Sequence, residues 1–220
     1  MSSGSAISGA TSGSAAASKA GFAFEELVGK ALLALAPPMK ARGWKTSLLT
    51  EQDIRDVFGE QSLNGVDHLF EVEDASGSVT VFLFQEKWKL MTNQREVSQF
   101  LDCCARILTR IPPARRGRVH RFWVTRSAPS ANGEKSLLEG GAYTIQCMTS
   151  PSLLAQITAQ MVCELLGDRA LAVPMIAGMP SLLPEESPLD PKVLDESKIS
   201  VAMPAAKMKV VVQKGDYFLP

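Results

Sequence analysis

Apolar residues recur at helical spacing near the start of the chain. They are Phe24, Leu27, Val28, Ala31, Leu32 and Leu35. This period predicts an amphipathic helix over residues 21–36, which the prolines at 37 and 38 close. The same spacing predicts three more helices. They cover residues 94–110, 131–139 and 152–166.

Between these helices lie short segments rich in Val, Phe, Leu and Ile, which predict strands. They cover residues 66–73, 79–85, 119–125 and 142–148, with a shorter strand at 44–49 and a helical turn at 51–60. The resulting order is helix, strand, hairpin, helix, strand, helix, strand, helix. Such alternation predicts an α/β layer structure built on a mixed sheet.

The hairpin over residues 66–85 can be given a register. A three-residue loop, Ala75-Ser76-Gly77, with the glycine in the left-handed conformation would pair Asp74 with Ser78. Asp67 then faces Gln85, and Lys87 lies diagonally beyond on the same face, because strand side chains alternate with a period of two. A loop of two or four residues would separate them.

Composition divides the 220 residues into a middle and two ends. Residues 1–20 are mostly Ser, Gly and Ala and predict a disordered tail, because they offer little apolar surface to bury. Residues 171–220 hold seven of the thirteen prolines and predict an irregular arm. Residues 21–170 are expected to form one domain, which is an ordinary size for a single core.

The four cysteines and the apolar segments exclude several classes. No Cys-x-x-Cys pair occurs, and His68 and His120 are the only histidines, so a structural zinc site is not expected. No secretory or membrane-spanning segment is visible, which predicts a soluble, intracellular protein without membrane association, cytoplasmic or nuclear. The Ser/Ala-rich start leaves organelle import open, although it lacks arginine.

Charge is balanced in total but uneven along the chain. The formal net charge is zero, eight acids fall within residues 51–74, and seven arginines without an acid fall within 105–126. The arginine-rich segment could neutralise DNA phosphates, although a solvated loop and helix end would look the same. The candidate nucleic-acid-binding residues are Lys89, Arg106, Arg110, Arg115, Arg116 and Arg118.

The aligned hairpin residues suit phosphodiester hydrolysis. A hard cation prefers oxygen ligands, which the Asp67 carboxylate, the Gln85 amide and the backbone carbonyl of Glu86 could supply. Lys87 would lower the pKa of the attacking water and offset charge on the phosphorus. The same residues also fit a plain role, with Asp67 as a turn residue at the strand end and Lys87 as a solvated side chain.

In their order, these motifs resemble the PD-(D/E)xK nuclease superfamily, specifically its Mrr-type restriction-endonuclease branch. The resemblance covers roughly residues 21–150. It is carried by Phe24-Glu25-Glu26-Leu27-Val28, Gly65-Val66-Asp67, Gln85-Glu86-Lys87, the following Trp88 and Lys89, and a strand ending in Thr125. It implies a restriction-endonuclease-like three-layer fold, with a mixed central sheet flanked by helices.

The resemblance further implies a Mg²⁺- or Mn²⁺-dependent endonuclease of the restriction or DNA-repair and junction-processing type, with DNA as its partner. Glu25, Asp67, Gln85 and Lys87 would form the active site, and Glu25, Asp67 and Gln85 would hold the metal. Val66 replaces the proline of the superfamily name, and glutamine replaces an acid at position 85, which should weaken metal binding.

Three alternatives stay open. Glu86 should point to the opposite face, but a register slip would make its side chain the metal ligand. A catalytically inactive module with the same fold, serving nucleic-acid binding or assembly, fits the neutral charge and Gln85 equally. A homodimer is compatible with two nicks in a duplex, which need two sites.

Overall fold

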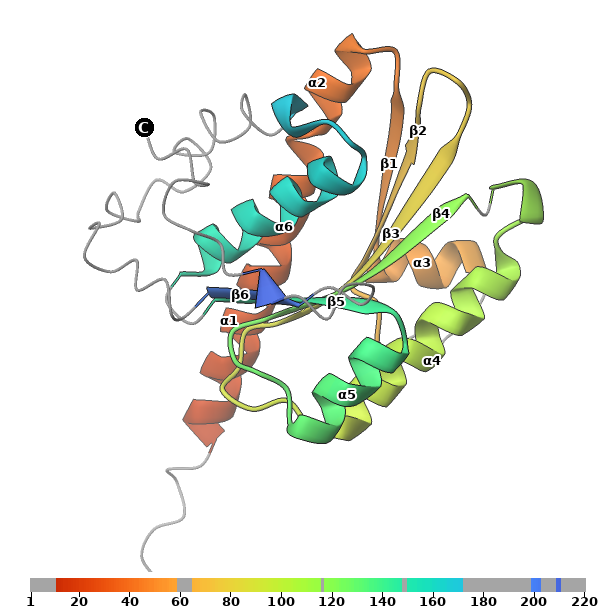
Figure 1. Ribbon diagram of the computed structural model, residues 1–220. Coiled ribbons are helices and arrows are strands. Elements are labelled where there is room, and N and C mark those ends of the chain that lie inside the picture. Colours follow the sequence, from red (N-terminus) through yellow and green to blue (C-terminus); the bar gives the residue numbers. More distant parts are fainter. Residues whose placement is uncertain are drawn as a thin grey trace, which may run out of the picture.

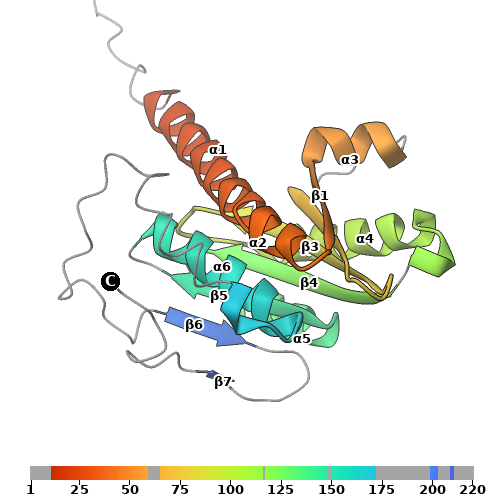
Figure 2. The same cartoon turned by 90° about the horizontal axis from the view of Figure 1, so that it is seen from above.

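The computed structural model describes residues 11–58, 65–115, 117–147, 150–171, 199–202 and 209–210. A mixed sheet lies between two layers of helices (Figure 1). Five strands, β1 to β5, form its main part, and β6 and β7 extend it at one edge (Figure 2). The strands are β1 Lys45–Thr50, β2 His68–Glu73, β3 Val79–Lys87, β4 Arg118–Thr125, β5 Ala142–Cys147, β6 Ile199–Ala202 and β7 Lys209–Val210.

Strand direction changes across the sheet. The pairs β1–β2 and β2–β3 are antiparallel, β3–β4 and β4–β5 are parallel, and β5–β6 and β6–β7 are antiparallel again. The parallel pairs are connected through helices, as parallel pairing requires. The predicted three-layer α/β fold with a mixed central sheet is therefore confirmed.

Each face of the sheet carries its own group of helices. On one face pack α1 Thr11–Leu33, α2 Ala36–Ala41 and α6 Pro151–Leu165; on the other pack α3 Glu51–Phe58, α4 Gln94–Arg110 and α5 Ala131–Glu139. Single 3₁₀ turns lie at Pro113–Arg115 and Arg169–Leu171. Strand β3 shows the division most clearly, because Phe82 and Phe84 join the α1 side while Val81 and Leu83 join the α4 side.

The predicted helices over residues 94–110 and 131–139 are confirmed with the same bounds. Helix α4 begins at a capping box, in which the Asn93 side chain accepts from the Glu96 amide and the Glu96 side chain accepts from the Asn93 amide. Because the cap satisfies otherwise unpaired amides, it fixes where the helix starts and how the preceding loop enters it.

The predicted boundaries of the first helix are wrong at both ends. Helix α1 begins at Thr11, so part of the segment expected to be a disordered tail is helical, and residues 1–10 lie outside the described residues. Alanine, frequent in this stretch, has the highest helix propensity. The helix ends at Leu33, and Pro37 and Pro38 start α2 instead of closing α1, because proline is well tolerated in a first helical turn.

The predicted arm over residues 171–220 lies mostly outside the described residues, and its described part beyond Leu171 forms two short strands. Strand β6 pairs with β5, and β7 pairs with β6. The β-branched Ile199 and Val201 favour an extended backbone, which the arm's proline content obscured. Strand β7 is the last part of the chain that the structure describes. Within the described segments, no helix is long and apolar enough to cross a membrane.

Candidate active site

The loop between β2 and β3 closes as predicted. The Asp74 amide donates to the Ser78 carbonyl at 2.9 Å, the Gly77 amide donates to the Asp74 carbonyl at 2.9 Å, and Gly77 has φ +82°. Only a residue tolerant of the left-handed region fits there without strain. The strands then pair from Glu73 with Val79 to His68 with Phe84, which is the expected register.

This register brings Asp67 together with Gln85 and Lys87. Oδ2 of Asp67 accepts a hydrogen bond from Nε2 of Gln85 and another, of 2.7 Å, from the Glu86 amide, and Nζ of Lys87 lies 3.8 Å away. Asp67 and Gln85 are buried, whereas Lys87 is partly exposed. The predicted convergence of the three side chains is confirmed, and their catalytic roles stay predictions.

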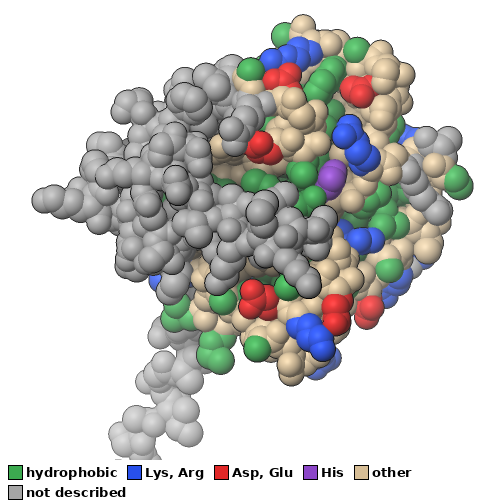
Figure 3. All heavy atoms as spheres, in the orientation of Figure 1, with side chains coloured by type: hydrophobic (Ala, Val, Ile, Leu, Met, Phe, Trp, Pro, Cys, Tyr) green, Lys and Arg blue, Asp and Glu red, His purple; other side chains and the backbone are tan. Residues whose placement is uncertain are grey.

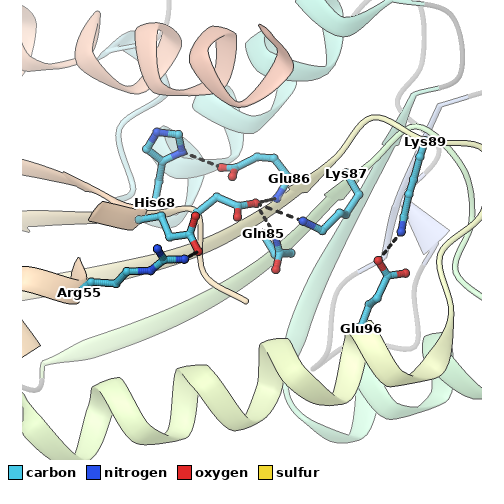
Figure 4. Close-up of polar contacts among 9 residues, drawn as sticks. Arg55, His68, Gln85, Glu86, Lys87, Lys89 and Glu96 are labelled. Atoms are coloured by element: carbon cyan, nitrogen blue, oxygen red, sulfur yellow. Dashed lines mark hydrogen bonds and ion pairs between the residues drawn. The ribbon is translucent and has the colours of Figure 1, made fainter. Parts of the chain in front are cut away.

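Glu86 points to the other face of the sheet, as alternation along the strand requires. Figure 4 shows Glu86 directed toward the α1 side and Gln85 toward α4. Oε1 of Glu86 lies 3.1 Å from Nδ1 of His68, while Oε2 is buried and has no hydrogen-bond partner among the described residues. Glu86 is only 1% exposed, so an anionic oxygen is left unsatisfied inside the protein.

Glu25 reaches the same region from α1. It is half-buried, and its pKa is raised to about 7, first by burial and then by the nearby Asp67 carboxylate, with Lys87 opposing. Glu26, the neighbour with which it could be confused, is exposed and forms an ion pair with Lys30 at 2.8 Å. The helix therefore presents Glu25, and not Glu26, to the hairpin residues.

The carboxylates in this cluster repel one another. Burial, and next the adjacent Glu86 carboxylate, raise the pKa of Asp67, although Lys87 and the Glu86 amide favour its charged form. Burial lowers the pKa of His68, but the Glu86 carboxylate more than compensates and the net direction is upward. The cluster thus holds more negative charge than Lys87 and His68 balance without protons.

A cleft of about 320 Å³ opens beside these residues. It is lined by Gly21, Phe22, Glu25, Glu86, Lys87, Trp88 and Lys89. Two side chains contact Trp88. The ring centroids of Phe24 and Trp88 are 5.3 Å apart, and the Arg126 guanidinium lies 5.2 Å from the Trp88 ring centroid. Packing against Phe24 and the cation–π contact fix the wall of the cleft next to Lys87.

The donor set fits a hard divalent cation held in part by water. Oxygen donors come from Asp67 and Glu86, with Glu25 nearby, and Oε2 of Glu86 accepts no hydrogen bond from a donor in the described residues, which leaves it open to a cation. Within the described ranges, no group of three or more His, Cys, Asp or Glu side chains is arranged to hold a metal by itself. Mg²⁺ commonly uses one or two carboxylates and keeps several waters, which matches this arrangement.

The candidate DNA-binding arginines lie far from this cluster. Arg118 pairs with Thr80 in the sheet while Lys87 pairs with Thr125, so the two ends are ~23 Å apart along β3. Arg115 forms an ion pair with Glu71, and Arg110 donates to the Phe58 carbonyl.

The remaining candidate basic residues do not build one patch around the site. Arg106 is exposed on α4, and Arg116 lies outside the described residues. Lys89 borders the cleft but forms an ion pair with Glu96. On the face seen in Figure 3, basic and acidic side chains are interspersed over the described surface. Their role in binding DNA therefore stays a prediction.

His68 is the site residue that the sequence analysis missed. The hairpin register that places Asp67 opposite Gln85 also places His68 opposite Phe84, and Glu86 is the diagonal neighbour on that face. The register could therefore have revealed the contact. All four cysteines are buried, and none of them forms a disulfide within the described part of the chain.

Comparison with known proteins adds little. No family model matches the chain, and no curated protein matches it. Among solved structures it is similar to the MspJI restriction endonuclease in complex with a 27-mer oligonucleotide, at 16% identity and a TM-score of 0.37. The match covers 84% of this chain and 40% of that one. A likeness of this size is distant, and nothing below rests on it.

Proposed function

We propose that this protein is a divalent-metal-dependent endonuclease that hydrolyses DNA phosphodiester bonds, of the restriction or the DNA-repair and junction-processing type. One observation carries the proposal. A buried carboxylate, an amide and an ammonium group, from Asp67, Gln85 and Lys87, meet at the end of a hairpin, beside a cleft that Glu25 also lines. The order of the matching sequence motifs supports the same conclusion.

Each residue has a role that follows from its chemistry. Asp67 and Glu86 would hold a Mg²⁺ or Mn²⁺ ion, with Gln85 as the predicted neutral oxygen ligand and Glu25 reaching the ion through water. The ion would supply Lewis-acid activation of the phosphate and lower the pKa of water. Gln85 keeps Asp67 oriented through its donated hydrogen bond. Lys87 stands at the edge of the cleft, where its positive charge would stabilise the charge that develops on the phosphorus oxygens.

A second candidate, an inactive module that binds nucleic acid or serves assembly, is favoured by one feature. Three donors inside the protein already approach Oδ2 of Asp67, and the pKa of this carboxyl is raised. Such a site can stay protonated and satisfied without a cation. The zero net charge also gives no strong general attraction to DNA.

A cleavage assay separates the two candidates. The purified protein is incubated with linear duplex, branched and single-stranded DNA, and with RNA, in Mg²⁺, in Mn²⁺ and in EDTA. The nuclease proposal expects cleavage of at least one DNA substrate with a metal and none in EDTA. DNA binding without cleavage under all conditions would support the inactive module instead.

A further inference from the structure

We infer that His68 is a positioning residue for the metal site, which aims the free oxygen of Glu86 at a cation shared with Asp67. This inference rests on the proposed function and names a feature that the sequence motifs do not contain. The pair lies on the face of the sheet opposite Gln85, so it would form the second wall of the site (Figure 4).

The geometry of the pair restricts Glu86 to one orientation. Nδ1 of His68 holds Oε1 of Glu86 at 3.1 Å, and the side chains are only 8% and 0% exposed. A carboxylate held by one oxygen in a packed site turns its other oxygen in a fixed direction. That oxygen, Oε2, accepts no hydrogen bond from a donor in the described part of the chain, and the Glu86 side chain lies within hydrogen-bonding reach of the Asp67 carboxyl group.

Without a cation, the Glu86 and Asp67 carboxyl groups can be satisfied only by sharing a proton. A buried polar group without a partner costs about 1–3 kcal/mol, and more when it is charged. Two neighbouring buried carboxylates add repulsion to that cost. One divalent cation bound to Oε2 and to Asp67 would remove both penalties, and this is the ligand chemistry that the arrangement fits.

Gly29 on α1 provides the space for the imidazole. A Cβ atom at this position would lie 2.9 Å from Nε2 of His68, too close for the ring to stay where it is. The helix backbone therefore covers the ring directly, and the sheet lies on its other side. This contact holds the ring against Glu86 in the way that outer-shell groups orient metal ligands.

The experiment measures Mn²⁺ binding to the full chain without DNA, by electron paramagnetic resonance of free Mn²⁺, so that the readout does not depend on cleavage. His68→Ala and Glu86→Gln are expected to weaken binding by about 10–100-fold, the usual effect of losing an outer-shell partner or a ligand. His68→Asn should recover most of the affinity, because its amide nitrogen can occupy the place of Nδ1.

Gly29→Ala separates positioning from stability. Alanine favours the helix by up to about 1 kcal/mol over glycine, yet its methyl group displaces the His68 ring. We expect weaker Mn²⁺ binding in a protein that still unfolds cooperatively, because the helix gain partly offsets the loss of the His68–Glu86 contact. His120→Ala is the matched control, since His120 stacks on Phe82 on β3 away from the cluster and should leave Mn²⁺ affinity unchanged.

Two results would overturn the inference in distinguishable ways. If Asp67→Asn abolishes Mn²⁺ binding while His68→Ala, Glu86→Gln and Gly29→Ala bind as wild type does, the positioning role is wrong and the metal site stands. If the wild-type protein itself binds no Mn²⁺, the proposed function and the inference fail together.

Discussion

Nζ of Lys87 lies 3.8 Å from Oδ2 of Asp67, the same oxygen that accepts the hydrogen bonds from Gln85 and from the Glu86 amide. All three donors therefore converge on one oxygen of the carboxylate. The Glu86 side chain also hydrogen-bonds to the Asp67 carboxyl group, so a cation would bind there in place of the proton that the two groups share. The lysine is close enough to act on a water or phosphate bound there.

Asp67→Asn should abolish cleavage while leaving the fold intact or stabilising it. The change removes the buried negative charge that repels Glu86 and keeps an oxygen that can accept from Gln85 and the Glu86 amide. We expect kcat to fall by ~10³ or more, as when a key electrostatic group is lost. Without metal, the melting temperature should equal or exceed that of wild type. Cleavage at the wild-type rate would rule out the mechanism.

Lys87→Met should also lower kcat, by about 10²–10³-fold, because the charge that offsets the phosphorus oxygens is lost while the side-chain stem stays. Stability should change by less than about 1 kcal/mol, since the ammonium is partly exposed. Lys45→Met is the matched control: its ion pair with Glu73 lies at the far end of the hairpin. Equal rates for the two variants would contradict the role of Lys87.

The hairpin shows what the sequence can determine. Loop length and the left-handed preference of Gly77 set the register, and the register places Asp67, Gln85 and Lys87 together. These are local relationships, and so they were predictable. The start of α1 was not, because Ser, Gly and Ala between residues 11 and 20 give no amphipathic pattern, and alanine propensity alone extends the helix.

The position of the arginines could not be predicted from their place along the chain. One helix, α4, separates Lys87 from Arg118 in the sequence. Because β4 runs parallel to β3, Arg118 at the start of β4 lies at the other end of the sheet from Lys87 at the end of β3. Only the direction of the crossover decides this, and a run of charges carries no information about it.

The stabilisation of the protein by a bound metal should increase with pH. Glu25, with a pKa near 7, and Asp67, with a raised pKa, hold protons that the unfolded chain releases above pH 4.5 or so. Folding then binds protons, so the metal-free protein loses stability as pH rises from about 4 through 8. The share of Glu25 alone is roughly 1–2 kcal/mol once solvent screening is allowed for.

Because a cation competes with those protons, the stabilisation by saturating Mg²⁺ should increase over the same range, reaching about 2.7 kcal/mol at 100 times Kd. Thermal unfolding at pH 5, 6, 7 and 8, in EDTA and in Mg²⁺, measures both effects. Glu25→Gln should flatten the EDTA curve. A metal-free stability that rises between pH 5 and 7 would show that these carboxyl groups are ionised in the folded protein.

Arg118→Ala should weaken binding of long duplexes only. The arginine lies ~23 Å from Lys87 along the sheet, which corresponds to about seven base pairs of duplex. If it contacts a phosphate at that distance, its loss should raise KM and lower the salt slope of binding by about one, with kcat unchanged. Wild type and variant should bind equally well to duplexes that end within about five base pairs of the cleaved bond. An equal loss on short and long duplexes would mean that DNA does not run along β3.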